Sequence, residues 1–441
     1  MERLIKIGKI KPRKASEIKN SRIGIGFEKL DRKVFNPEKA YDKLAMIGAK
    51  WVRIQSGWER TEQEKGVYDF EWLDSIVDNL LERGLVPWIN LAYGNGLYDD
   101  DAAKVFGAVG CPPVKSEEAK KGWADYITAL AAHMKGRISY YEVWNEPDGE
   151  WCWKHGPNGK EYGQFVVDTS VALKKGDSSA KVIGGAICMA KPLDFAYDAF
   201  SVGMGEHIDA ISFHEYVIDE TVVFRHVKAL RGLCNRFNPN IEIIQGESGS
   251  QSRSDGRGAM RKGAWTPHKQ AKQLLRHLMA DLMTEVKFTS YFSCMDMIEA
   301  LNGTVGDLVS YLDYGYFGVL GADFDAQGRS VGNYTPKPSY YALQTISAIF
   351  SEDVQKADLP IIRWPEVSDR LFGFDCDDPS IVEGGFKCEN GSAAFVYWNS
   401  TNLMTTDFES TVTFYTAGLP DKIRLVDLMD GTVYELSLIH I

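Results

Sequence analysis

Residues 140–148 read Tyr140-Tyr141-Glu142-Val143-Trp144-Asn145-Glu146-Pro147-Asp148. Aromatic and β-branched residues favour a strand here, and Pro147 cannot donate a further ladder hydrogen bond. We therefore expect Asn145 and Glu146 to lie at the carboxyl end of a strand. In a barrel of parallel strands, the loops that leave the carboxyl ends build the active site, whereas the opposite rim mainly serves stability. The segment predicts a buried strand that ends on a functional carboxylate.

Strands and helices are expected to alternate on both sides of this segment. The apolar runs predict eight strands, at 22–27, 51–54, 86–91, 138–144, 181–187, 208–213, 241–245 and 288–293. Amphipathic helices are expected at 38–47, 70–85, 117–134, 161–175, 193–202, 221–235, 267–286 and 339–350. Each strand is too apolar to face water on either side, which is typical of an α/β fold of the (β/α)8 type, the TIM barrel.

A doubly wound open sheet is the alternative architecture. Such a sheet ordinarily carries an early glycine-rich phosphate turn that opens a helix. The segment Gly24-Ile25-Gly26-Phe27-Glu28 does not continue in that way. We therefore favour the barrel.

The pattern changes near the C-terminus, where short strand candidates are separated by Gly, Asn and Asp turns. These strands are expected at 371–374, 393–398, 411–415, 423–427 and 432–436. We predict three parts: an N-terminal strand segment at 1–21 that packs on the last domain, a catalytic barrel at 22–352, and a smaller β-sandwich at 353–441. The closing residues 436–441 leave open whether the last domain is truncated.

Composition and charge restrict the class of partner. Asp and Glu number 61 against 50 Lys and Arg, a formal net charge of -11, which argues against nucleic acid or an anionic membrane and favours a neutral polar ligand. No run approaches the roughly 18 apolar residues of a membrane span. The charged start of the chain lacks the apolar core of a secretory signal, and the seven scattered cysteines suit reduced thiols, so we expect a cytoplasmic protein. The oligomeric state stays open.

A second carboxylate, Glu247, follows the strand expected at 241–245. A closed barrel brings the ends of its fourth and seventh strands to opposite sides of one pocket. Glycosidic bonds are cleaved by two carboxyl groups, one of which protonates the leaving oxygen while the other attacks or guides water. For a retaining reaction, we predict about 5 to 5.5 Å between the carboxyl groups of Glu146 and Glu247.

These motifs resemble clan A of the glycoside hydrolases, in which Asn-Glu-Pro follows the fourth strand and a glutamate ends the seventh. Within the clan, the sequence is most similar to family 39, which includes β-xylosidases and α-L-iduronidases. The segments that carry this similarity are Val143–Asp148, Gly26–Glu28 and Asp209–Tyr216. The resemblance covers roughly residues 22–350, and it implies a retaining enzyme with a trailing β-sandwich.

The resemblance also implies roles for particular residues. Glu146 would be the general acid/base, which must carry a proton, and Glu247 the nucleophile, which must stay ionised. Four more residues would bind the sugar or hold the nucleophile charged; they are Arg53, Asn145, His214 and Tyr216. Gly246 and Ser248 flank Glu247 where the family often has Thr and an aromatic residue, and no aromatic residue follows the eighth strand in an obvious way. The identity of the sugar therefore stays open.

Aromatic side chains in loops are the remaining candidates for sugar contacts. Trp151 and Trp153 follow Glu146 in the polar segment 148–153, and this polarity favours stacking on a sugar over a place in the core. Trp58 and Tyr93 are further candidates, and for the three tryptophan rings a place in the core is the alternative.

The sequence therefore predicts a retaining glycoside hydrolase with β-xylosidase-like exo activity on an oligosaccharide. Another clan A specificity, for a uronide or an arabinoside, and a carbohydrate-binding protein without turnover are the alternatives. A barrel aldolase would need a Schiff-base lysine at a strand end, and none of the eight ends offers one. We expect no metal and no cofactor, because no H-x-x-x-H motif or cysteine pair accompanies the histidines.

Overall fold

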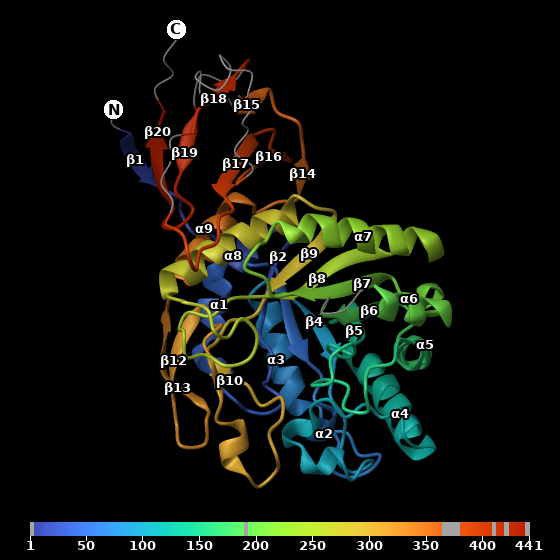
Figure 1. Ribbon diagram of the computed structural model, residues 1–441. Helices are drawn as coiled ribbons and strands as arrows, with labels where there is room; N and C mark the ends of the chain where they lie inside the picture. The colour runs from blue at the N-terminus through green and yellow to red at the C-terminus, as the bar shows by residue number, and fades with distance from the viewer. Residues whose placement is uncertain (1–3, 189–192, 364–379, 408–411, 419–422, 437–441) are drawn as a thin grey trace.

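The computed structural model describes residues 4–188, 193–363, 380–407, 412–418 and 423–436. Eight parallel strands close into a barrel in chain order, and Figure 1 shows helices around its outside. The barrel strands are β2 (Ile23–Gly26), β3 (Trp51–Gln55), β4 (Val86–Leu91), β5 (Tyr140–Val143), β6 (Lys181–Ile187), β7 (Ala210–Glu215), β8 (Glu242–Ser248) and β9 (Val286–Tyr291). The predicted (β/α)8 barrel is confirmed.

The helices follow the strands as the sequence predicts. They are α1 (Tyr41–Ile47), α2 (Trp58–Thr61), α3 (Glu71–Glu82), α4 (Glu117–Met134), α5 (Gly159–Gly176), α6 (Asp194–Ser201), α7 (Val222–Phe237), α8 (Pro267–Leu282) and α9 (Pro338–Ile349). Polar caps fix several starts, since Ser116, Asn158 and Thr266 each accept a hydrogen bond from a backbone N–H in the first turn of α4, α5 and α8. Short 3-10 turns lie at Ala15–Glu17, Pro37–Lys39, Ala102–Lys104, Phe106–Ala108, Met204–Glu206 and Leu308–Tyr311.

The interior of the barrel is layered. Side chains two apart on a strand point to the same face, so Trp51 and Arg53 of β3 both point inward at successive levels. Near the amino ends of the strands the floor is apolar; its buried members are Trp88, Ile183, Ala210, Ile244 and Phe288. Trp51 stacks on Phe288 with ring centroids 4.2 Å apart. The next level, toward the carboxyl ends, is polar and carries the candidate site.

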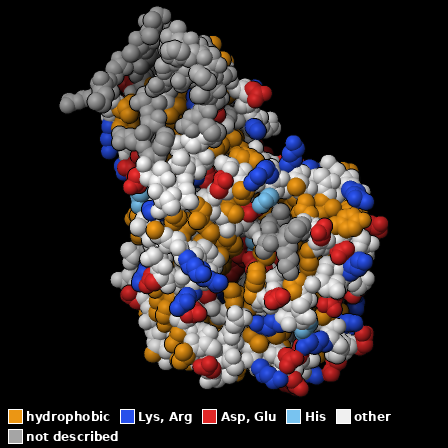
Figure 2. Space-filling model, in the orientation of Figure 1, with side chains coloured by type: hydrophobic (Ala, Val, Ile, Leu, Met, Phe, Trp, Pro, Cys, Tyr) orange, Lys and Arg blue, Asp and Glu red, His pale blue; other side chains and the backbone are white. Residues whose placement is uncertain are grey.

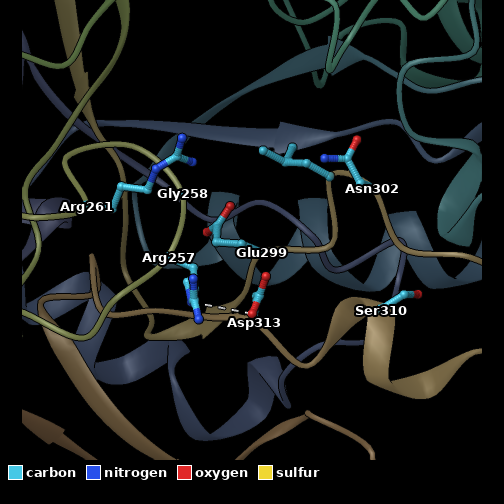
Figure 3. Close-up of a pocket in the computed structure, with 8 residues that line it drawn as sticks. Arg257, Gly258, Arg261, Glu299, Asn302, Ser310 and Asp313 are labelled. Atoms are coloured by element: carbon cyan, nitrogen blue, oxygen red, sulfur yellow. Dashed lines mark ion pairs between the residues drawn. The ribbon is translucent and has the colours of Figure 1, made fainter.

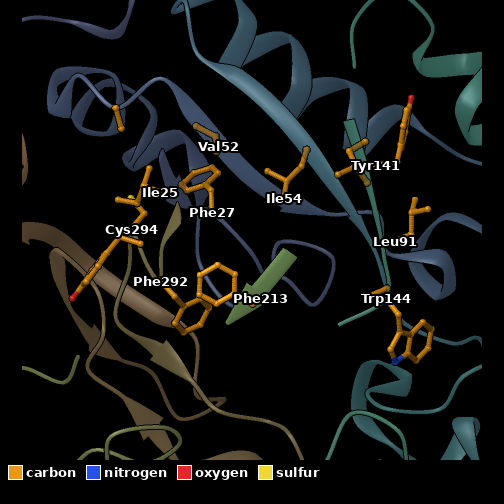
Figure 4. Close-up of a cluster of buried hydrophobic side chains, with 14 of the residues drawn as sticks. Ile25, Phe27, Val52, Ile54, Leu91, Tyr141, Trp144, Phe213, Phe292 and Cys294 are labelled. Carbon is orange, nitrogen blue, oxygen red and sulfur yellow. The ribbon is translucent and has the colours of Figure 1, made fainter. Parts of the chain in front are cut away.

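A larger apolar cluster fills the space between the strands and the helices. Figure 4 shows its members from several strands, among them Ile25, Leu91 and Phe213, gathered around the barrel wall. None of the described helices is long and apolar enough to cross a membrane. On the face in view in Figure 2, basic and acidic side chains are interspersed rather than gathered by sign.

Two small hairpins occupy the long connection between β9 and α9. They are formed by β10 (Met297–Ile298) with β11 (Tyr314–Gly315) and by β12 (Leu320–Phe324) with β13 (Ser330–Pro336). Both lie on the same side of the barrel in Figure 1.

The C-terminal region is rich in β-strands and lies at one end of the molecule with both chain termini (Figure 1). One sheet joins β1 (Ile5–Lys9), β20 (Thr432–Glu435) and β19 (Arg424–Val426); a second joins β14 (Val354–Lys356), β16 (Ile381–Cys388) and β17 (Ala393–Asn399); a third joins β15 (Ile361–Arg363) and β18 (Phe414–Thr416). The N-terminal strand thus pairs with the last strand. The predicted strand at 371–374 and the first residue of the one at 411–415 lie outside the described residues, and the three-part division of the chain stays a prediction.

A buried ion pair joins this region to the barrel. Arg276 of α8 donates to Glu220 at 2.8 Å and to the carbonyl of Thr401 at 3.0 Å, and the indole of Trp398 donates to Glu220 at 2.7 Å. Glu220 closes the loop that leaves β7. The C-terminal region therefore supports a loop at the carboxyl end of the barrel.

Replacing Phe288 with alanine tests the apolar floor. We expect Phe288→Ala to lower the free energy of unfolding by about 3–5 kcal/mol, because a buried ring is lost and a cavity remains. Val171→Ala on α5 is the control; its side chain is 59% exposed, so the change should stay within about 0.5 kcal/mol. Urea denaturation followed by tryptophan fluorescence checks both variants, and equal midpoints would contradict the packing described.

Candidate active site

Two carboxylates face each other across the carboxyl end of the barrel. Glu247 is the second-last residue of β8, and Glu146 follows β5. One oxygen of each carboxylate and one ring nitrogen of His214 all lie within 4.8 Å of one another. β5 and β8 are not neighbours in the sheet, so barrel closure is what brings the two side chains together.

The backbone after β5 turns sharply to present Glu146. Trp144 and Glu146 have positive φ values of 69° and 44°, a conformation that residues other than glycine adopt rarely and mostly at functional turns. The predicted strand therefore ends one residue early, at Val143. The backbone N–H of Glu146 still bonds to the carbonyl of Ala186 at 2.9 Å, which fixes the turn against β6.

Arg53 of β3 connects the acidic side chains from beneath. Its guanidinium donates to Glu142 at 2.5 and 2.8 Å, to the amide oxygen of Asn145 at 2.8 Å, to Glu28 at 3.4 Å, and to Glu247. Burial disfavours the charged guanidinium, but the charges of Glu142, Glu247 and Glu28 outweigh burial and raise the pKa of Arg53. The group is a permanent cation below the site.

Glu247 is held in its ionised form. Burial alone would raise the pKa of this carboxyl group, but the positive charges of His214 and Arg53 and a hydrogen bond from the Tyr216 hydroxyl lower it. The Tyr216 hydroxyl donates to Glu247 at 2.6 Å, and His214 Nδ1 lies 3.6 Å from the same carboxylate. The carboxylate remains 10% exposed, so a ligand can reach it while Arg53 and His214 are fully buried.

Glu146 has different partners. His214 Nδ1 lies 3.1 Å from one of its oxygens, and the half-buried indole of Trp151 donates to the other. Burial lowers the pKa of His214, but the charge of Glu247 and the hydrogen bond with Glu146 outweigh burial and raise it. One imidazole thus contacts both carboxylates, and Trp151 and His214 together set the direction of Glu146.

Two buried glutamates belong to the same network but were not among the predicted site residues. Glu142 accepts hydrogen bonds from Asn90 at 2.9 Å and Ser212 at 2.6 Å besides those from Arg53, so it positions the guanidinium rather than facing the pocket. Glu142 lies two residues after Tyr140 on β5, so both side chains point into the barrel. The sequence alone is enough to recognise this position. Glu28 follows β2. The pKa of Glu28 is raised to about 8, mainly by burial; the positive charge of Arg53 lowers this pKa, and the negative charge of Glu247 raises it.

The crowded space around position 246 explains why a glycine precedes Glu247. A Cβ atom at this position would lie 3.0 Å from a carboxylate oxygen of Glu142 and 3.0 Å from His214 Nε2. Both neighbours are fully buried and have little room to move. A glycine therefore lets β8 approach the polar layer closely.

Two of the predicted sugar-stacking rings are in the core, and those predictions are wrong. Trp58 is fully buried, stacks between Tyr98 and Tyr126, and donates to Glu62 at 2.5 Å. Trp153 is also fully buried; its ring packs edge-on against Trp144, and its indole N–H donates to Glu161 at 3.0 Å. In both cases a carboxylate satisfies the indole, which allows the ring to be buried in a polar segment.

The other predicted residues gather around the carboxylates. Asn145, His214, Tyr216 and Trp151 contact Arg53, Glu146 or Glu247 as described above. Tyr93 lies behind them, with its ring 3% exposed and its hydroxyl 3.6 Å from the sulfur of Cys152, which lies 3.5 Å from the Asn145 amide. The role of each of these residues toward a sugar stays a prediction.

Glu146, His214 and Glu247 are also the described residues whose ligand atoms are close enough to share a metal ion. The cationic guanidinium of Arg53 contacts Glu247 directly, and His214 is drawn toward its protonated form. Both positive charges would repel a cation. The arrangement is better suited to proton transfer than to metal binding.

Comparison with known families matches residues 38–231 to glycosyl hydrolases family 39. The chain is thus similar to that family over this part of the barrel. The matched range contains β5 and Glu146, whereas Glu247 lies beyond it. The place of Glu247 in the site is therefore given by the geometry alone.

Two curated β-xylosidases are similar to part of this chain. The one from Caldicellulosiruptor saccharolyticus is 30% identical over 191 residues, which cover 39% of this chain and 38% of that protein. The one from Geobacillus stearothermophilus is 29% identical over 163 residues, which cover 34% of this chain and 31% of that protein. The chain thus matches less than half the length of either relative.

Solved family 39 structures share the fold. A family 39 glycoside hydrolase from Bacteroides cellulosilyticus WH2 superposes with a TM-score of 0.66 at 17% identity, covering 96% of this chain and 80% of that one. A family 39 β-xylosidase from Caulobacter crescentus superposes with a TM-score of 0.55 at 19% identity, covering 87% and 80%. At these identities the likeness supports the fold.

Glu28 provides a test through the pH dependence of stability. Its pKa in the folded protein is about 8, above the value of about 4.3 in an unfolded chain. The folded state therefore holds this proton more tightly, and the stabilisation that it contributes, complete below pH 4.3, is lost as the pH rises toward 8. The slope is at most about 1.4 kcal/mol per pH unit.

We expect Glu28→Gln to flatten this part of the stability curve, because the amide does not ionise. Chemical denaturation between pH 5 and 8 measures the free energy of unfolding of both proteins. The difference between them should shift in favour of the variant as the pH rises. A difference that does not depend on pH would show that Glu28 is ionised in the folded protein.

Proposed function

We propose that this protein is a retaining glycoside hydrolase that releases a β-linked xylose from the end of an oligosaccharide. The observation that carries the proposal is the pair of facing carboxylates, Glu146 and Glu247, with oxygens within 4.8 Å of each other. Carboxyl groups about 5 to 5.5 Å apart suit direct attack on the sugar, whereas about 6.5–9.5 Å leaves room for an intervening water. The spacing supports the retaining reaction.

Glu247 is the nucleophile in this proposal. The lowered pKa of Glu247 leaves its carboxylate charged near neutral pH, so its oxygen can form a bond with the anomeric carbon. Glu146 donates its proton to the glycosidic oxygen as the bond to the leaving group breaks. The products of this step are the free leaving alcohol and a sugar esterified to Glu247.

Glu146 then reverses its role. Its carboxylate takes a proton from a water molecule, whose oxygen attacks the anomeric carbon and releases Glu247. His214 and Trp151 keep the Glu146 carboxyl directed during both steps through the contacts that they make with its two oxygens. Arg53 fixes the amide oxygen of Asn145 and Cys152 accepts from its amide nitrogen, which leaves one amide N–H to donate to the sugar 2-hydroxyl.

The preference for xylose rests on the two β-xylosidases that are similar to this chain. Another sugar, a uronide or an arabinoside, is the nearest alternative, because the carboxylate pair does not distinguish among them. A binding protein without turnover is less well supported. Such a protein gains nothing from a second carboxylate, Glu146, held facing the ionised Glu247.

Replacing each carboxylate with alanine tests their roles. With 4-nitrophenyl β-D-xyloside, we expect no detectable turnover for Glu247→Ala, and added azide should restore it by forming a glycosyl azide of inverted configuration. For Glu146→Ala we expect a loss of about 10²–10⁴-fold in kcat/KM on an unactivated xylobioside, with azide giving a product of retained configuration. The release of nitrophenol measures turnover, and NMR gives the configuration of the azide products.

Glu206→Ala is the matched control, since this carboxylate lies in a short turn away from the site, and its activity should equal that of the wild type. Turnover by Glu247→Ala without azide would contradict its role as nucleophile. If the wild-type protein turned over no glycoside in a panel of xylosides, arabinosides and uronides, the protein would be a binder.

Tyr216→Phe tests how the ionised form of Glu247 is maintained. The variant loses the 2.6 Å hydrogen bond to the carboxylate, so the pKa of Glu247 should rise. A hydrogen bond to a charged group contributes about 1.5–3 kcal/mol, which corresponds to a shift of one to two pH units. The acidic limb of the kcat/KM profile should therefore move to higher pH, and an unchanged limb would exclude this role for Tyr216.

A further inference from the structure

A polar pocket lies between two loops at the carboxyl end of the barrel. Its volume is about 170 Å³, and it lies between the loop that follows β8 and the segment between β10 and β11. Figure 3 shows the side chains of Arg261, Glu299 and Asn302 directed toward the same space. Pockets for drug-sized ligands occupy roughly 300–1,000 Å³, so this pocket suits a single sugar unit.

Lys154, in the loop that presents Glu146, contacts two residues that line the pocket. Lys154 donates from its ammonium group to the carbonyl of Leu301 at 3.2 Å and to the side chain of Asn302 at 3.3 Å. Lys154 comes three residues after Trp151, whose indole donates to Glu146. The pocket is therefore linked through Lys154 to the loop that carries the acid/base residue.

The floor of the pocket is linked to the other side of the site. Glu299 is buried and pairs with Lys29 at 3.0 Å, and Lys29 follows Glu28 directly in the chain. The negative charge of Glu247 is close enough to help raise the pKa of Glu299, after the larger effect of burial. Glu299 lines the pocket and its side chain is 9% exposed, so the carboxylate oxygen that does not face Lys29 can accept from a sugar hydroxyl.

The charges of the pocket do not cancel. Lys29 neutralises Glu299, and Arg257 pairs with Asp313 at 3.6 Å. Arg261 has no carboxylate partner within the part of the chain that the structure describes, and its guanidinium points into the pocket (Figure 3). A guanidinium offers a planar set of donors that matches a carboxylate or sulfate group.

We propose that this pocket binds an anionic sugar unit adjacent to the sugar that is cleaved. Arg261, assisted by Arg257, pairs with a carboxylate or sulfate group on that unit, and Glu299 accepts from one of its hydroxyls. The inference rests on the proposed function, because it places the acidic unit next to the bond that Glu146 and Glu247 break. It assigns the natural substrate to acidic rather than neutral oligosaccharides.

The test measures binding separately from turnover. Isothermal titration of the full chain carrying Glu146→Gln is performed with xylotriose, with xylotriose bearing a glucuronosyl group, and with a sulfated xylotriose. At least one acidic ligand should bind about tenfold or more tightly than xylotriose, as expected for a hydrogen-bonded charge pair, and the preference should fall as salt is added. The acidic ligand that binds more tightly identifies a carboxylate or a sulfate as the natural group.

Arg261→Gln in the same background should remove the preference and leave the affinity for xylotriose unchanged. Arg261→Lys should keep part of it, because the charge remains without the planar fork. Arg329→Gln is the control, since Arg329 is exposed and pairs with Asp325 at 2.9 Å in the β12–β13 hairpin. Equal affinities for acidic and neutral ligands, or a preference that survives Arg261→Gln, would overturn the proposal.

The result also separates this proposal from the proposed function. If acidic ligands bind through Arg261 but the wild-type protein turns over no glycoside, the pocket binds an anionic sugar and the proposed hydrolase function is wrong. If the protein turns over neutral xylosides and shows no preference for acidic ones, the proposed function holds and the proposal for the pocket is wrong.

Discussion

The buried guanidinium of Arg53 is the interaction on which the site depends. A fully buried cation is costly unless carboxylates surround it, and here Glu28, Glu142 and Glu247 supply them from three other strand ends. Those contacts require the barrel to be closed, because β5 and β8, which carry Glu142 and Glu247, are not neighbours of β3 in the sheet. In return, the cation helps to keep Glu247 ionised and directs the amide of Asn145. Folding and chemistry are therefore coupled through one side chain.

The layers of the barrel explain why this network can exist. The apolar floor ends at Trp88, whose ring lies 5.6 Å from the guanidinium carbon of Arg53, and the polar level begins directly above it. Water is excluded from below, so each charge at this level is neutralised by a neighbour rather than by solvent. The loop after β7 is held from outside by Glu220, Arg276 and Trp398, which gives Tyr216 a fixed place beside Glu247. Rigid support on both sides favours preorganised chemistry.

Much of this arrangement follows from local sequence. The bounds of β4, β6 and α4 coincide with the predicted ones, since apolar runs and a capping serine mark them, and the strand-end positions of Glu146 and Glu247 were recognised from short motifs. The burial of Trp58 and Trp153 was missed because it depends on Glu62, Glu161 and ring partners that only the folded chain brings near. The strand alternation of β5 places Glu142 inside the barrel, but its contact with Arg53, like that of Glu28, also depends on residues that only the folded chain brings near. The start of β9 at Val286, two residues earlier than expected, shortened α8 to Leu282.

The central claim is that Glu247 attacks a sugar held between it and Glu146. The most direct measurement uses a 2-deoxy-2-fluoroxyloside with a good leaving group, which slows breakdown of the ester more than its formation, followed by proteolysis and mass spectrometry. The account predicts one fluoroxylosyl group per chain, attached to the peptide that contains Glu247. A label on another residue, or an unlabelled protein that still hydrolyses xylosides, would contradict it.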